Sequence, residues 1–281
     1  MSWRIEIMHR SGYRYEKDVW ASYNEVRMTP ATTDRQRVIS SRFSVSPTAT
    51  TTWYVDYWGT LVQVFDLHLR HDELEIVSAS LVQTSTPDQV SVDCSWEDLG
   101  GDDLLDHFDE YLQHTQFTAI DDAVVTVADE LRAGAGSPAE AVQAVAEWVR
   151  TNMLYSTGAT AVTTTAPEAL AQRSGVCQDF AHVSIAMLRA MGVPARYVSG
   201  YLHPTPDGEL GERVAGQSHA WVEAWCNGWR AFDPTNASPV GERHVLVGNG
   251  RDYADVPPFK GVYQGGASET TGVEVTLTRV A

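Results

Sequence analysis

Hydrophobic and polar residues alternate along the first third of the chain. Trp3, Ile5 and Ile7 alternate with their neighbours, and similar runs occur at 13–16, 61–69 and 74–77. Alternation places successive side chains on opposite faces of a strand, so that one face can be buried. Turn-forming residues separate the runs: Gly12, Asn24, Pro30, Pro47 and Gly59. Strands with this spacing predict an N-terminal β-sandwich domain over residues 1–96.

The pattern changes to helical spacing after residue 97. Residues 102–115 and 121–133 carry hydrophobic side chains every three or four positions, which predicts two amphipathic helices. The clearest helix start is Ser137–Glu140, where a capping serine, a proline and a glutamate form a capping box. A second capping box at Thr165–Glu168 predicts a short helix ahead of the next hydrophobic run.

That run, from Phe180 to Met191, predicts a buried helix that Gly192 and Pro194 close. Strand-like runs then dominate, at 195–201, on both sides of the Asn-Gly dipeptide at 227–228, and at 273–280. Residues 97–281 are therefore expected to form an α+β core with helices packed on an antiparallel sheet and a C-terminal strand. Four helix side chains should be buried in this core: Phe180, Val183, Met187 and Leu188.

Composition narrows the possible partners. The chain has 281 residues, a formal net charge of -17 and a pI of about 4.8. Such a charge repels phosphate backbones and anionic lipid, so neither nucleic acid nor a membrane is an expected partner. There is no apolar run long enough to span a membrane, and Met1–Glu6 does not resemble a signal peptide. Three cysteines, at 94, 177 and 226, fit a reducing compartment, so we expect a cytoplasmic protein.

Three residues in order along the chain suit covalent acyl transfer: Cys177, His219 and Asp233. Cys177 stands where the buried helix should begin, and backbone N–H groups there favour a thiolate and can bind an oxyanion. His219 begins a strand-like run, and Asp233 ends the next one. A thiol, an imidazole and a carboxylate can act as nucleophile, base and orienting group. Each also has an ordinary explanation, as a small buried cysteine, a strand histidine and a turn aspartate.

The register of the hairpin between the last two residues decides whether they can meet. A strict two-residue turn at 227–228 would point the imidazole and the carboxylate to opposite faces of the sheet. A three-residue connection pairs Trp225 with Trp229 and puts both side chains on one face. A longer loop or a β-bulge would also put them on one face. Although Asn-Gly usually signals a two-residue turn, we predict that the hairpin is not a simple two-residue turn. Either Gly228 has a positive φ in a bulge, or the pairing is broken near the turn.

Four further residues are candidates for binding the substrate or an oxyanion. Tyr155 and Asn152 precede the cysteine and could donate hydrogen bonds to an oxyanion. Gln178 follows the cysteine directly, and Trp221 is one of three tryptophans near the proposed site. Packing within the sheet is the ordinary role for these tryptophans.

Metal and cofactor chemistry has little support in the sequence. Cys177, Cys226, His219 and Asp233 are zinc-ligand residue types, but no CxxC or HxxxH pair is present and the spacings match no zinc module. There is also no phosphate-binding glycine-rich loop and no dinucleotide fingerprint. We therefore expect neither a metal nor a cofactor.

Four segments closely resemble the bacterial transglutaminase-like family: Gly175–His182, Leu188–Tyr201, His219–Glu223 and Phe232–Thr235. The tail at 250–258 is also similar, and Arg27–Pro30 resembles the N-terminal β domain of many members. The resemblance implies a papain-like core that uses Cys177, His219 and Asp233 in this order.

The resemblance also implies a substrate class, the amide bonds of peptides or proteins, attacked through a thioester. An amine acceptor would give transglutamination. Water would give deamidation or proteolysis, so a cysteine peptidase or amidase is the alternative. A non-catalytic binding module is the alternative of another class. There is no calcium-loop signature of the animal transglutaminases, so no calcium requirement follows, and the oligomeric state is left open.

Overall fold

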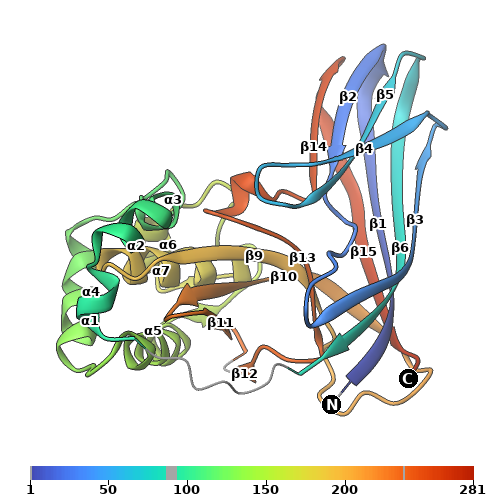
Figure 1. Cartoon of the computed structure of the whole chain (residues 1–281). Helices are drawn as coiled ribbons and strands as arrows, with labels where there is room; N and C mark the ends of the chain where they lie inside the picture. The colour runs from blue at the N-terminus through green and yellow to red at the C-terminus, as the bar shows by residue number, and fades with distance from the viewer. Residues whose placement is uncertain (1, 87–93, 237) are drawn as a thin grey trace.

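The molecule has two parts, a helical part packed on a sheet and a tall β part beside it (Figure 1). The computed structural model describes residues 2–86, 94–236 and 238–281. This mixed architecture, with mainly antiparallel sheets, confirms the predicted α+β fold class. Within the described ranges, each helix is too short or too polar to cross a membrane.

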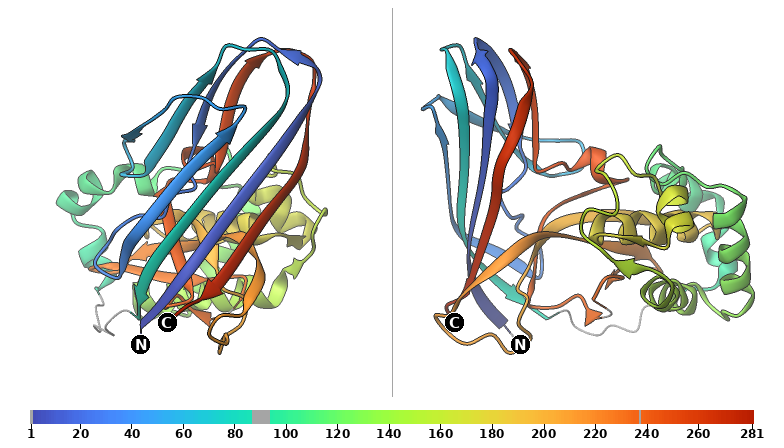
Figure 2. Two further views of the ribbon diagram at one scale, coloured as in Figure 1. Left: turned by 90° about the vertical axis from the view of Figure 1, so that its right-hand side faces the viewer. Right: turned by 180° about the vertical axis from the view of Figure 1, so that it is seen from behind.

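The β part consists of two antiparallel sheets (Figure 2). Its strands are β1 (Ser2–Val19), β2 (Ala21–Val26), β3 (Gln36–Ser46), β4 (Thr51–Val55), β5 (Leu61–Leu67), β6 (His71–Ser85), β14 (Phe259–Gln264) and β15 (Ser268–Arg279). One sheet contains the order β15-β1-β6-β3, and the other is β14-β2-β5-β4. The predicted alternation holds along β1, where Trp3, Ile5 and Ile7 are buried and their neighbours are exposed. Side chains such as Phe65 and Leu74 fill the space between the sheets.

The last two strands of the chain complete these sheets. β15 pairs with β1, from Ile5 opposite Arg279 to Tyr15 opposite Ser268, and β14 pairs with β2. The two termini therefore lie close together at one end of the β part (Figure 2). The expected domain boundary at residue 96 separates the N-terminal strands from the helices. However, β14 and β15, at residues 259–279, belong to the same sheets as the strands of residues 2–85.

The helical part is built around one buried helix. Its helices are α1 (Trp96–Leu99), α2 (Asp102–His107), α3 (Asp109–Leu112), α4 (Asp122–Ala133), α5 (Pro138–Asn152), α6 (Ala166–Gln172) and α7 (Cys177–Ala190). α7 packs against α4, α5 and α6 and against the sheet behind them. All four side chains predicted to lie in the core are at most 2% exposed, because α7 is covered on every side.

The predicted helix starts are largely as expected. Ser137 Oγ accepts a hydrogen bond from the Glu140 N–H, but the Glu140 carboxylate accepts from the Gly136 N–H at 2.7 Å, so this capping box is only half formed. The second box is complete on the glutamate side, because Glu168 Oε2 accepts from the Thr165 N–H at 2.8 Å. The caps place α5 and α6 where the sequence predicted them.

The predicted helix over 102–115 is instead two short helices, α2 and α3, which meet at Phe108. Phe108 is buried, with its ring 4.5 Å from that of Trp225 and 5.6 Å from that of Trp229. Packing of this ring against the hairpin accompanies the break, which hydrophobic spacing alone does not reveal.

One long strand connects the two parts. The core strands are β9 (Ala195–Leu202), β10 (Arg213–Trp225), β11 (Trp229–Asp233), β12 (Ser238–Pro239) and β13 (His244–Gly250). Residues 213–216 of β10 pair with β15, whereas residues 217–224 pair with β9. Three minor elements complete the fold: β7 (Leu154–Tyr155), β8 (Ser174–Gly175) and a 3-10 helix (Tyr253–Asp255). His219 lies in the part of β10 that pairs with β9, close to the point where the pairing partner changes from β15.

The hairpin from β10 to β11 has a three-residue connection, because Trp225 pairs with Trp229, which confirms that it is not a simple two-residue turn. The residue with a positive φ is Asn227, at 60°, so the expectation for Gly228 was wrong. The Cys226 N–H donates to the Gly228 carbonyl at 3.0 Å and closes the turn. Asparagine tolerates the left-handed region better than most residues, so the middle position of the connection can adopt it.

Candidate active site

Cys177 is the first residue of α7 and is half-buried. The helix start is fixed by Asp179, whose Oδ2 accepts from the Val176 N–H at 2.8 Å and from the Thr160 hydroxyl at 2.7 Å. A Cβ on Gly175 would lie 2.5 Å from Asp179 Oδ2, so this close entry into the helix requires glycine. Backbone N–H groups of a first helical turn have no acceptor within the helix, so they can donate to an oxyanion.

His219 and Asp233 lie on neighbouring strands, β10 and β11. His219 is 9% exposed and Asp233 is 2% exposed. His219 Nε2 donates to Asp233 Oδ2 at 2.7 Å, and His219 also makes a side-chain hydrogen bond with Cys177. Because Nε2 faces the carboxylate, Nδ1 is the ring nitrogen available to the thiol. We refer to Cys177, His219 and Asp233, which the structure brings together, as the triad.

The Asp233 carboxylate is held by the turn that follows it. Oδ1 accepts from the Thr235 N–H at 2.9 Å and from the Asn236 N–H at 3.1 Å. Oδ2 accepts from the Asn236 side-chain amide at 2.9 Å, beside the bond from His219. Pro234 ends the strand, and the turn then folds its donors back onto the carboxylate.

The groups around His219 favour the protonated form of its imidazole. Burial lowers the pKa of His219, but its hydrogen bonds with Asp233 and Cys177 outweigh burial and raise the pKa to about 9. Burial also acts to raise the pKa of Asp233, but hydrogen bonds from His219 and His244 hold it well below its usual range. At neutral pH, an imidazolium therefore stands between the thiol and a carboxylate.

Two of the other predicted residues lie near the start of α7. Tyr155, on β7, is 43% exposed, and burial followed by the charge of Cys177 raises the pKa of its phenol. The Gln178 side-chain amide donates to the Val162 carbonyl at 2.9 Å. Gln178 thus ties the loop before α6 to the helix start, while Tyr155 borders the thiol.

The remaining two predicted residues do not line the site. Asn152 ends α5, and its side-chain amide donates back to the Trp148 carbonyl at 2.8 Å. Trp221 is 1% exposed, with its ring 6.2 Å from that of His219. A Cβ on Gly200, which pairs with His219, would lie 2.6 Å from the Trp221 ring. Trp221 therefore packs beside His219 inside the protein.

Three residues beside the triad were not predicted: Asn236, His244 and Tyr197. Asn236 and His244 donate to Asp233, and Tyr197 is a buried tyrosine of β9 whose pKa is raised by burial and by the charge of Cys177. The position of Asn236, three residues after Asp233, could have indicated an Asx turn. His244 has no local signal, because it reaches the site from β13.

A metal ion near the triad would need ligands from the side chains around Asp233. Within the described part of the chain, the group that could hold an ion is His219, Asp233 and His244, whose ligand atoms lie within 4.8 Å of one another. The Gly241 N–H donates to His244 Nδ1 at 3.2 Å, so Nδ1 is an acceptor and Nε2 carries the proton of the neutral ring. A metal ion at Nε2 would need the opposite tautomer. The group fits a hydrogen-bonded carboxylate better than a metal ion.

Comparison with known proteins places the chain in a family. Residues 125–234 match the transglutaminase-like superfamily, and residues 5–83 match the bacterial transglutaminase-like N-terminal region. An uncharacterised protein of Mycobacterium leprae is 43% identical over 279 residues, covering 99% of this chain and 100% of that protein. The chain belongs to the transglutaminase-like superfamily. This confirms the resemblance in the sequence, and the family supports a cysteine-dependent enzyme.

Two further proteins are similar to this chain, one in its fold and one over part of its sequence. The crystal structure of a proposed cysteine protease from Cytophaga hutchinsonii has a TM-score of 0.80 and 22% identity, covering 100% of this chain and 92% of its own, so the two share the fold. The protein-glutamine gamma-glutamyltransferase of Pseudomonas aeruginosa is 38% identical over 96 residues, which are 30% of this chain and 14% of that protein. This second similarity covers only a fraction of either protein.

Proposed function

We propose that this transglutaminase-like protein is a cysteine acyltransferase that acts on amide bonds of peptides or proteins through a thioester intermediate. The observation that carries the proposal is the alignment of the triad. His219 bonds Asp233 at 2.7 Å on one side and Cys177 on the other, and Cys177 begins a buried helix. A nucleophile, a base and a group that orients the base are then in reach of one another.

In the first half-reaction, Cys177 Sγ attacks the carbonyl carbon of a substrate amide. The C–N bond breaks, a C–S bond forms, and ammonia or an amine leaves with the proton that His219 supplies. Backbone N–H groups at the start of α7 would donate to the developing oxyanion, and the Tyr155 hydroxyl is a second donor beside the thiol. The carboxylate of Asp233 keeps the imidazole in the orientation and tautomer that the transfer needs.

In the second half-reaction, an acceptor attacks the thioester. The acceptor gives its proton to His219, the C–S bond breaks, and Cys177 returns to the thiolate. An amine acceptor joins two molecules by a new amide bond, whereas water gives a carboxylic acid. The partial similarity to a protein-glutamine gamma-glutamyltransferase supports a glutamine side chain as the acyl donor.

Mass spectrometry of glutamine-containing peptides, incubated with and without a primary amine, tests the proposal. We expect the wild-type protein to give an amine adduct with loss of ammonia, and Cys177→Ala to give none. Cys94→Ala is the matched control, since Cys94 has intermediate burial and lies outside the triad. Deamidated peptide alone would assign water as the acceptor, and cleaved peptide would assign proteolysis. Turnover that survives in Cys177→Ala would refute the nucleophile.

A further inference from the structure

The carboxylate of Asp233 accepts a hydrogen bond from His244, in addition to those from His219 and from the turn that follows Asp233. His244 Nε2 lies 3.3 Å from Asp233 Oδ2, and both side chains are buried. His244 begins β13, so this donor comes from outside the hairpin that carries His219 and Asp233. Asp233 thus accepts from three side chains at a single oxygen, those of His219, Asn236 and His244.

The proton of the His244 ring is placed by a backbone contact. The Gly241 N–H donates to Nδ1 at 3.2 Å, which leaves Nε2 as the N–H that points at Asp233. Burial lowers the pKa of His244, although the hydrogen bond with Asp233 opposes the shift, so the ring stays neutral at neutral pH. A neutral donor binds the carboxylate without competing for its charge, which is left to pair with the protonated His219.

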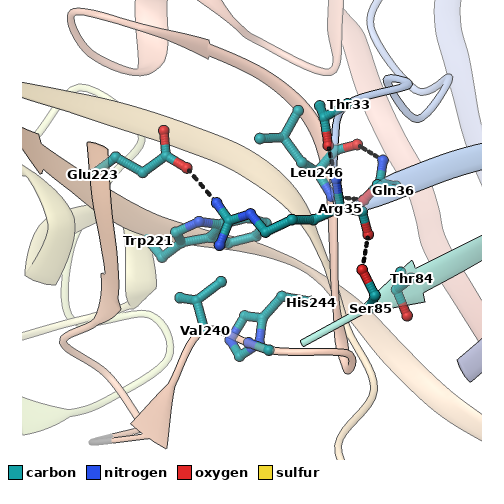
Figure 3. A pocket seen from close by; sticks show the side chains of 11 residues that line it. Thr33, Arg35, Gln36, Thr84, Ser85, Trp221, Glu223, Val240, His244 and Leu246 are labelled. Carbon is teal, nitrogen blue, oxygen red and sulfur yellow. Dashed lines mark hydrogen bonds and ion pairs between the residues drawn. The ribbon is translucent and has the colours of Figure 1, made fainter. Parts of the chain in front are cut away.

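His244 also lines a pocket. A cavity of about 50 Å³ lies where the β part meets the core, and its lining includes Arg35, Trp221 and His244 but not Asp233 (Figure 3). This volume can hold ordered water. The His244 ring lines this pocket and packs edge-to-face with the Trp221 ring, with centroids 5.4 Å apart.

We propose that His244 is a positioning residue of the active site, which acts through Asp233 to hold His219 in line with Cys177. The inference rests on the proposed function, because a positioning role has meaning only for a working triad. Oδ1 is anchored by backbone N–H groups of the turn, and His244 with Asn236 fixes the direction of Oδ2. The short bond to His219 then has one orientation, as a catalytic imidazole requires.

Two substitutions separate this role from simple packing. In His244→Gln, the side-chain amide can place an N–H where Nε2 stands and donate to Asp233. In His244→Asn, the amide oxygen can still accept from Gly241, but the side chain is too short to reach Asp233. The readout is the rate at which iodoacetamide alkylates Cys177 at neutral pH, because this rate depends on the imidazole beside the sulfur and needs no known substrate.

We expect His244→Asn to slow alkylation of Cys177 roughly 10- to 100-fold, the size of loss that a misplaced catalytic group produces. His244→Gln should recover most of that rate, and the two variants should melt at similar temperatures. His203→Gln is the matched control, since His203 is also a buried histidine but contacts no triad residue among those described. It should alkylate at the wild-type rate.

Five results would overturn the role of His244. Equal rates in wild type and His244→Asn would show that the contact does not matter. Equal losses in the Asn and Gln variants, or a His244→Asn protein that does not fold, would show a structural role. A wild-type rate that falls with EDTA and returns with zinc would assign a metal site instead. If the proposed function itself is wrong, Cys177 of the wild-type protein should be alkylated as slowly as in His219→Ala. That result would overturn both the proposed function and the role of His244.

Discussion

Trp225 pairs directly with Trp229 across the three-residue connection between β10 and β11. This pairing sets the register of the whole hairpin, and with it the face to which each side chain points. Counted back along both strands, His219 and Asp233 fall on one face, where their side chains meet at 2.7 Å. A register shifted by one residue would place them on opposite faces, so the turn is a condition for the triad.

The turn makes a prediction about Asn227, which has a φ of 60°. Asn227→Ala should lower the free energy of unfolding by about 1 kcal/mol, because most side chains are strained in the left-handed region. Asn227→Gly should be neutral or slightly stabilising, because glycine has no Cβ to strain. Urea denaturation of the three proteins measures the difference. Equal stability of the alanine and glycine variants would contradict the strain.

Much of this arrangement could be predicted from the sequence, because it follows from local patterns. Alternation along 3–8 identified β1, and the hydrophobic run after Cys177 identified α7. The geometric requirement that an imidazole and a carboxylate share a face predicted that the hairpin is not a simple two-residue turn, against the usual meaning of Asn-Gly. The break at Phe108 was missed, since it accompanies contacts with residues more than a hundred positions away. The pairing of β15 with β1 was also missed, because strand order depends on the whole fold.

Replacement of the carboxylate tests how Asp233 works. Asp233→Asn keeps an oxygen for the N–H groups of Thr235 and Asn236, but its amide can present an N–H to His219 Nε2. That contact favours the tautomer with a proton on Nδ1, which cannot accept a proton from Cys177. Turnover should fall roughly 10²- to 10⁴-fold.

The measurement is alkylation of Cys177 together with peptide turnover, and thermal melting should show a folded protein. Asp252→Asn is the matched control, because Asp252 is also buried but serves the 3-10 helix, where it accepts from the Ala254 N–H. Wild-type rates in Asp233→Asn would mean that the carboxylate does not orient His219.

A second buried charge has a structural role. Arg189, on α7, is 4% exposed and donates to five acceptors: the carbonyls of Tyr111, Gln113, Ala195 and Arg251, and the Thr118 hydroxyl. Burial lowers its pKa to about 10, so it stays charged at neutral pH. Arg189→Met should lower the free energy of unfolding by about 3 kcal/mol or more, because it leaves several buried acceptors without a donor.

Chemical denaturation tests this prediction, with Arg150→Met as the control. Arg150 is an exposed arginine that pairs with Glu147 on the surface of α5, so its loss should not change stability measurably. Similar effects of the two substitutions would show that the buried contacts of Arg189 contribute little.

The sequence could predict only those site residues whose type and position along the chain are unusual. A thiol at a helix start and two polar residues on paired strands are unusual enough to be singled out. His244 was not, because nine histidines occur in the chain and nothing near position 244 marks it. Its contact with Asp233 depends on where β13 lies beside β9, which is a tertiary relationship. Asn152 and Trp221 have local roles instead, since the Asn152 amide donates within its own helix and Trp221 is buried in the sheet.

The pKa of His219 predicts how stability changes with pH. It is raised from 6.5 to about 9 in the folded protein, so folding favours the protonated ring. The stability that His219 contributes is therefore fully present below about pH 6.5 and is lost as the pH rises through 9. The gap in unfolding free energy between wild type and His219→Gln should shrink over that interval. Turnover should fall above the same pH, because the imidazolium that protonates the leaving amine disappears.

His182 supplies a control with the opposite sign. Burial, followed by the charge of Arg189, lowers its pKa to about 3, so the folded protein favours a neutral ring. In His182→Gln, an oxygen can still accept from the Tyr253 N–H, which His182 Nε2 now does at 3.2 Å. Wild type should lose stability relative to this variant as the pH falls below 6.5, where the unfolded histidine takes up a proton. Urea denaturation at several pH values measures the difference in unfolding free energy between wild type and each of the two variants. A gap for His219→Gln that stays constant or widens toward pH 9 would mean that His219 is not held as an imidazolium by its two partners.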